Sequence, residues 1–174
     1  MTPSKAGRSG LEVERCPGCD AELPVVDGAV HPYVGASSAC WTRFAELGVT
    51  LPPGGTPLRR LVTDAYMVQH PGIPERRAIQ SVGVHLVALY LVLERGLPPD
   101  DLSATLQRIL ARPPAWRWLE PPVPNGTSTV VDLETSIAAG RTTDVIEAYV
   151  RGVWASWTPH RATVEQWARA AGVA

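Results

Sequence analysis

The chain has 174 residues, of which 45% are hydrophobic and 19% are charged, a balance that supports a folded domain with a real core rather than a disordered chain. Its formal net charge is -1, from 16 basic and 17 acidic side chains, so no broad cationic surface is available to hold phosphates. This argues against nucleic acid as the main partner.

Residues 1–14 are rich in Ser, Gly, Lys and Arg and predict a flexible leader, without the apolar core of a signal peptide. The most hydrophobic run of the chain, Val82 to Leu93, contains His85 and is too short to cross a bilayer. We therefore expect a cytoplasmic protein that does not associate with membranes. In a reducing compartment, an odd number of cysteines argues against a disulfide framework and favours metal ligation.

All three cysteines fall within the first 40 residues. Cys16 and Cys19 flank a Pro-Gly pair, forming a C-x2-C knuckle that points both sulfurs at one place, and His31 and Cys40 follow. These four side chains can complete a tetrahedron around Zn²⁺. The alternative is a surface turn with incidental cysteines. Zinc is favoured because its ligation can contribute about 10–16 kcal/mol in small peptides, enough to order a turn-rich segment.

The ligand count bears on the role of this zinc. Four protein ligands leave no position for water, which is the mark of a structural site. If His31 were not a ligand, the three cysteines would leave one position open, and the imidazole, which precedes a proline in a turn, could point into a cleft instead. We favour the closed, structural Cys3His site.

The rest of the chain predicts helices. Ser37 or Ser38 could cap a first helix that carries Cys40, before the Pro-Pro-Gly-Gly break at 52–55. Helical spacing then recurs at 58–69, 75–95, 98–110, 143–157 and from Pro159 onward. The second of these helices is apolar almost all the way round its middle, which places it at the centre of a bundle. Residues 129–132 fit either a strand or an N-cap, and 125–128 predict a simple turn.

This pattern predicts a mainly α fold, a helical bundle of five or six helices with a small zinc-bound N-terminal lobe. We expect a single domain over residues 15–174, in which the zinc-knuckle lobe occupies 15–47 and the helical bundle 56–174.

The histidines form a second candidate constellation. His70 lies at a helix end, His85 lies midway along the apolar helix, and His160 lies in the first turn of the last helix. Helical bundles build metal and cofactor sites in their cores, where three such side chains could converge. Asp64 could orient one of the histidines, or it could pair with Arg76 or Arg77. The alternative is that each histidine only hydrogen-bonds a neighbour or is solvated.

Several motifs spread over the chain from residue 16 onward are more specific than its composition. They are Cys16-Pro17-Gly18-Cys19, His31-Pro32-Tyr33, Cys40-Trp41, Asp64-Ala65-Tyr66, Val68-Gln69-His70-Pro71-Gly72, Arg76-Arg77-Ala78-Ile79-Gln80-Ser81-Val82 and Trp118-Leu119-Glu120-Pro121-Pro122. Together they resemble a bacterial family of unknown function that is common in actinomycetes. The resemblance implies an intact domain and carries no established activity.

A second resemblance is architectural. The helical pattern is similar to that of the DinB/YfiT-like bundles, which bind a metal through three histidines, two of them paired as H-x3-H. Here the position four after His160 is Val164, so the likeness implies a shared architecture without a shared metal site.

These observations lead to one function and one alternative. The first is a Zn²⁺-binding helical protein with a small-molecule active site for hydrolysis, isomerisation or group transfer. In it His85 acts as base or ligand, His70 and His160 are its companions and Asp64 is the orienting carboxylate. The alternative is a non-enzymatic module, stiffened by the zinc knuckle, that meets a protein partner through exposed tryptophans or prolines. A nucleic-acid role for the knuckle is disfavoured because residues 16–40 contain no lysine or arginine.

Overall fold

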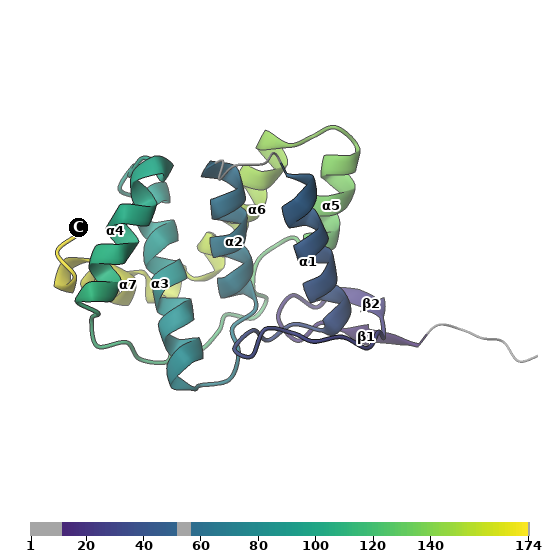
Figure 1. Ribbon diagram of the computed structural model, residues 1–174, viewed down its shortest axis with the longest axis horizontal. Helices are drawn as coiled ribbons and strands as arrows, with labels where there is room; N and C mark the ends of the chain where they lie inside the picture. Colours follow the sequence, from purple (N-terminus) through teal and green to yellow (C-terminus); the bar gives the residue numbers. More distant parts are fainter. Residues whose placement is uncertain (1–11, 52–56, 174) are drawn as a thin grey trace, which may run out of the picture.

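The computed structural model describes residues 12–51 and 57–173 (Figure 1). Within them, two short strands and seven α-helices follow one another, with one 3-10 turn before the last helix. The elements are β1 (Val13–Arg15), β2 (Glu22–Pro24), α1 (Ser38–Thr50), α2 (Pro57–Gln69), α3 (Arg76–Leu93), α4 (Pro99–Ala111), α5 (Val130–Ala138), α6 (Thr143–Ser156), η1 (Thr158–His160) and α7 (Arg161–Ala170). The predicted fold class, a mainly helical protein with a small N-terminal lobe, is confirmed.

The N-terminal lobe begins with an antiparallel hairpin. Strands β1 and β2 pair with Glu14 opposite Leu23, and the C-x2-C knuckle forms the turn between them. Most of the predicted leader lies outside the described residues, and its last two, Val13 and Glu14, belong to β1. In Figure 1 this hairpin lies at the foot of α1, below the row of helices.

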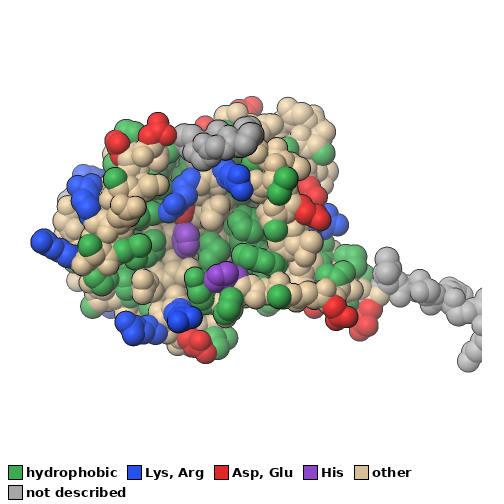
Figure 2. Space-filling view, viewed as in Figure 1, with side chains coloured by type: hydrophobic (Ala, Val, Ile, Leu, Met, Phe, Trp, Pro, Cys, Tyr) green, Lys and Arg blue, Asp and Glu red, His purple; other side chains and the backbone are tan. Residues whose placement is uncertain are grey.

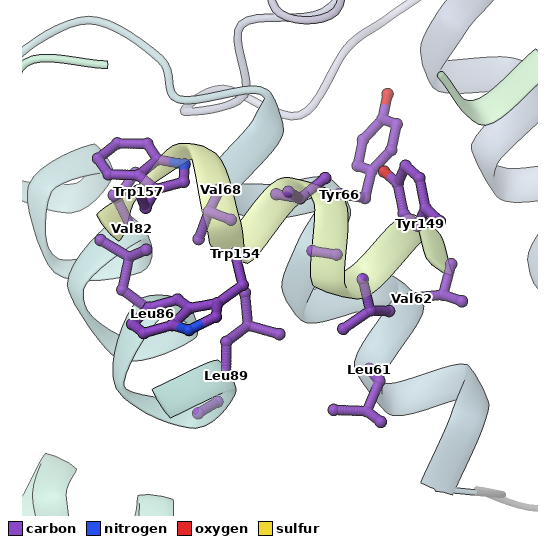
Figure 3. Packing of buried hydrophobic residues seen from close by; sticks show 14 of the residues in the cluster. Leu61, Val62, Tyr66, Val68, Val82, Leu86, Leu89, Tyr149, Trp154 and Trp157 are labelled. Atoms are coloured by element: carbon purple, nitrogen blue, oxygen red, sulfur yellow. The ribbon is translucent and has the colours of Figure 1, made fainter. Parts of the chain in front are cut away.

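Helices α2 and α3 are both central to the bundle, as the sequence predicted for α3. They pack against each other and both contact α4 and α6, while α3 also contacts α7, and α1 packs against α5. Figure 1 shows α1, α2, α3 and α4 side by side, with α6 and α7 behind them. The buried apolar residues Leu61, Val62 and Tyr66 of α2 recur at helical spacing and belong to the same core cluster as Leu86 of α3 and Tyr149 of α6 (Figure 3). Burying each such side chain stabilises the fold by about 1.5–3 kcal/mol.

Helix α3 is less uniformly buried than its sequence predicts. By length and composition alone it could cross a membrane, with a mean hydropathy of 1.2 over 18 residues, but half of it is buried inside the protein. That makes it weak evidence for a membrane span, because a core helix has the same composition. Its other side carries polar residues, including Gln80, Ser81 and His85, which line a groove on the surface.

Two segments that the sequence left open or read as simple have defined roles. Thr129 is the N-cap of α5, where its hydroxyl accepts from the backbone of Asp132 and the Asp132 carboxylate accepts from the backbone of Thr129. With α5, the described residues form seven α-helices, where five or six were expected.

The turn at 125–128, predicted as a simple turn, is bound to the end of α2. The side-chain amide of Asn125 donates to the carbonyls of Val68 and Gln69.

Candidate metal centre and histidine groove

The C-x2-C knuckle is pressed against the C-terminal end of α2. Its turn is closed by the backbone bond from Asp20 to the carbonyl of Cys16, at 2.9 Å, and Asp20 has a left-handed φ of 59°. A Cβ atom on Gly18 would lie 2.4 Å from Cδ2 of His70 and 2.9 Å from the carbonyl oxygen of Gln69. Only glycine fits there, so the Pro-Gly pair of the motif brings the knuckle onto His70.

Three thiols and one imidazole gather at this contact. The ligand atoms of Cys16, Cys19, Cys40 and His70 all lie within 4.8 Å of one another. The sulfurs of Cys19 and Cys40 are 3.9 Å apart, and the Cys40 sulfur is 3.4 Å from Nε2 of His70. Around a tetrahedral zinc ion two sulfurs would be about 3.8 Å apart, and a sulfur and a nitrogen about 3.6 Å. The cluster could therefore hold a metal ion without a rearrangement of the backbone.

The surroundings of His70 leave the correct nitrogen available. Its Nδ1 lies 2.9 Å from the carbonyl oxygen of Tyr66, and because a carbonyl only accepts, Nδ1 carries the proton. Nε2 then presents its lone pair to the sulfurs, as a metal-bound histidine does. The Tyr66 hydroxyl lies 3.5 Å from the Cys40 sulfur, and its ring stacks on that of His70 with 3.9 Å between centroids. Burial raises the pKa of Tyr66, so its hydroxyl stays protonated and donates to the sulfur.

Without a bound cation, the three cysteines are not all ionised. Hydrogen bonds from Cys19 and Cys40 lower the pKa of Cys16, which makes it the preferred thiolate of the three. The bond to Cys16, helped by burial, raises the pKa of Cys40 to about 12, and the bond to Cys16 likewise raises the pKa of Cys19. A bound divalent ion would override this difference, since metal ligation requires all three thiolates and releases their protons.

The predicted fourth ligand, His31, is not a member of this cluster, and His70 takes its place. The His31 ring packs edge-on against Tyr33, 4.1 Å between centroids, and 5.9 Å from Trp41. Its Nδ1 is buried and has no hydrogen-bond partner among the described residues. The loop that carries His31 pairs with the segment after α2, where the backbone N–H of Gly35 donates to the carbonyl of His70. Sequence spacing favoured His31. The pairing of the 33–35 loop with the segment after α2 instead brings His70 to the sulfurs.

A second site lies on the adjoining face of α2 and α3. Nδ1 of His85 is 2.7 Å from Oδ1 of Asp64, whose side chain is fully buried. The arginine paired with this carboxylate is Arg60, with Nε 3.2 Å from Oδ2, and not Arg76 or Arg77 as the sequence suggested. His85 is 17% exposed and lines a groove of about 410 Å³. The groove residues are Tyr33, Arg77, Gln80, Ser81, Val84 and His85. Figure 2 shows histidine side chains on this face, with basic side chains above and below them.

The structure does not bring the three predicted histidines together. His70 belongs to the thiol cluster and His85 to the groove, while Nε2 of His160 lies 2.8 Å from the backbone oxygen of Glu120. Of the proposed catalytic set, only Asp64 and His85 are in contact. Among the described residues, the thiol cluster is the single group of three or more Cys, His, Asp or Glu side chains arranged to hold a metal.

The chain belongs to a family of unknown function, DUF5946, whose model matches residues 14–158. The matched region includes the four residues of the thiol cluster as well as Asp64 and His85. No curated protein and no solved structure matches the chain. The expected membership of an uncharacterised family is therefore confirmed, and the likeness to DinB/YfiT-like bundles has no support from these comparisons.

Proposed function

We propose that this member of the family is an enzyme in which His85 is the general base of a small-molecule site and the thiol cluster holds a structural zinc ion. The observation that carries the proposal is the 2.7 Å bond from His85 to the fully buried Asp64 at the wall of the groove. A carboxylate on Nδ1 selects the tautomer in which Nε2 is free to accept a proton, and it stabilises the imidazolium that results.

The zinc ion has a structural role in this proposal. Cys16, Cys40 and His70 are completely buried, and with Cys19 they supply four protein donors, which leaves no position for water or substrate. Thiolate and imidazole donors in a tetrahedron suit Zn²⁺ better than Mg²⁺ or Ca²⁺. When bound, the ion would link the knuckle, α1 and the end of α2. Metal analysis of the purified chain is expected to find about one zinc ion per chain.

The environment of Asp64 favours a functional pairing over an incidental one. A fully buried carboxylate is destabilising by several kcal/mol unless charged or hydrogen-bonding partners compensate it. Here the partners are the guanidinium of Arg60, at 3.2 Å, and the ring of His85. Both partners are in contact with solvent, whereas the carboxylate is not. Because water does not screen it, the negative charge of Asp64 acts strongly on the imidazole of His85.

Hydrolysis is the reaction that this pair can perform with the fewest additional components. Nε2 of His85 takes a proton from water as the water oxygen adds to an acyl carbon of the substrate. The tetrahedral adduct then expels the leaving group, to which the imidazolium returns the proton. Water is the only co-reactant. Isomerisation or group transfer would use the same base at the same atom.

The activated ester 4-nitrophenyl acetate tests this role. H85Q should lower the rate of 4-nitrophenolate release by about 10²- to 10⁴-fold, the usual contribution of a general base. H160Q is the matched control, because His160 lies outside the groove, and it should keep the wild-type rate. Unchanged melting temperatures and metal contents would show that both variants fold. A wild-type rate no higher than that of free imidazole, or an H85Q rate equal to the wild-type rate, would exclude His85 as the base.

A protein-interaction module is the second candidate. It is favoured by the proline-rich segment 121–124, in which Val123 is 93% exposed beside the knuckle residues Pro17 and Gly18. Tryptophans are less suited to a partner, because all six are buried or half-buried. An interaction module would lose its binding on V123D and would be unaffected by H85Q, which is the opposite of what the enzyme proposal expects.

A further inference from the structure

We propose that the groove takes an elongated small molecule with a carboxylate or phosphate at one end, and that Arg77 binds this charged group while His85 acts on the other end. This inference rests on the proposed function of His85 and adds the class of its substrate.

The layout of the groove sets the shape of the ligand. Its lining residues on α3 run from Arg77 to His85, and Tyr33 closes it from the loop opposite. Eight residues at a rise of 1.5 Å place the two ends about 12 Å apart along the helix axis. The volume, about 410 Å³, lies within the range of about 300–1,000 Å³ that is typical of small-molecule sites. A ligand that reaches both ends is therefore longer than it is wide.

The charges of the groove favour an anion at the Arg77 end. None of the six lining residues is acidic, and the carboxylate in contact with His85, that of Asp64, is buried and already paired. Arg77 is exposed and takes no part in the ion pairs of the described residues. A guanidinium binds carboxylates and phosphates through two parallel hydrogen bonds, so this free side chain suits either group.

The first turn of α3 adds to this preference. It contains no acidic side chain, and Glu75 at the N-cap makes no capping hydrogen bond with its carboxylate. The positive end of the helix dipole therefore faces Arg76 and Arg77, an arrangement that disfavours both cations. An anion bound by Arg77 beside the free N–H groups of this turn would compensate the helix end and the guanidinium together.

A pair of esters tests the assignment. Mono-(4-nitrophenyl) sebacate carries a carboxylate at the far end of a chain long enough to span the groove, and its methyl ester is the neutral equivalent. The wild-type chain should hydrolyse the anionic ester with a kcat/KM about tenfold higher than that of the neutral one, a preference that falls as salt rises. R77Q should lose the preference, whereas R76Q should keep it. Arg76 is the matched control because it is exposed in the same turn and does not line the groove.

The outcomes separate this inference from the proposed function. Equal rates for the two esters in the wild-type chain, with both rates still abolished by H85Q, would overturn the anion site and leave the general base intact. Rates insensitive to H85Q would overturn both. An equal loss of preference in R76Q and R77Q would show a general charge effect and overturn the assignment to Arg77. Inhibition by sebacate or by inorganic phosphate, removed by R77Q, would support the site and tell a carboxylate ligand from a phosphate one.

Discussion

His70 and His85 both turn Nδ1 toward an oxygen atom of α2, yet their second ring nitrogens have different surroundings. His70 is completely buried, and its Nε2 lies 3.4 Å from the Cys40 sulfur inside a closed set of donors. His85 is 17% exposed and borders the groove, where Nε2 has no hydrogen-bond partner among the described residues. Two oxygen atoms of α2 thus hold the two imidazoles in the same tautomer. The His70 ring is enclosed, and the His85 ring is open to the groove.

The oxygen atoms that hold these histidines also differ. His70 donates to the neutral backbone carbonyl of Tyr66, which suits a ring that must stay neutral to bind a metal. His85 donates to the carboxylate of Asp64, which stabilises a ring that gains a proton. The comparison indicates that the partner of Nδ1, rather than burial alone, would separate the proposed metal ligand from the proposed base.

The largest expected effect comes from exchanging the two histidines in turn for glutamine. H70Q should lower the metal content from about one ion per chain to near zero, with a loss of several kcal/mol of stability, because structural zinc contributes directly to folding. H85Q should leave both quantities close to those of the wild-type chain. Metal content by mass spectrometry and unfolding in urea measure the two effects.

H31Q is the control for this comparison, since His31 is the ligand that spacing predicted and the structure places outside the cluster. It should retain the metal. A metal-free H31Q, or an H70Q that still binds one ion, would contradict the assignment of the fourth ligand. A chelator should act on the wild-type chain as H70Q does, lowering its melting temperature.

A smaller effect is expected where the knuckle meets α2. A methyl group on Gly18 would lie 2.4 Å from the His70 ring, so G18A must displace either the ring or the knuckle. We expect a loss of about 1–3 kcal/mol, as for other overpacked sites, together with weaker metal binding. G28A is the matched control, because the nearest atom to its added methyl group would be 3.6 Å away. Equal stability and equal zinc affinity in the two variants would contradict the close contact.

The sequence predicted those parts of the site that depend on local geometry. The knuckle follows from a four-residue motif, and Cys40 follows from a nearby helix start. His70 could not be chosen over His31 by spacing, since its place depends on the pairing of the 33–35 loop with the end of α2. Helix α5 stayed open for a related reason: its valine-rich start suits a strand as well as a helix, and the capping box of Thr129 settles it.

The contact between Asp64 and His85 was expected. The ion pair of Asp64 with Arg60 was not. Helical periodicity places a residue on a face, but it does not tell which neighbouring helix will cover that face. The predicted convergence of His70, His85 and His160 failed on this point, because α3 turns His85 toward α2 and the groove, away from the loop that binds His160.

The smallest expected effect is on the His85 ring itself. D64A removes the acceptor of Nδ1, so the ring should populate both neutral tautomers instead of one, with a loss of stability of only about 1–2 kcal/mol because Arg60 and His85 both reach solvent. Nitrogen-15 chemical shifts of the imidazoles measure the change. His70 serves as the internal control: its acceptor is the backbone oxygen of Tyr66, which no substitution at position 64 removes, so its shifts should not move. If His85 kept a single tautomer in D64A, the carboxylate would not be what orients it, and the distinction drawn between the two histidines would lose its physical basis.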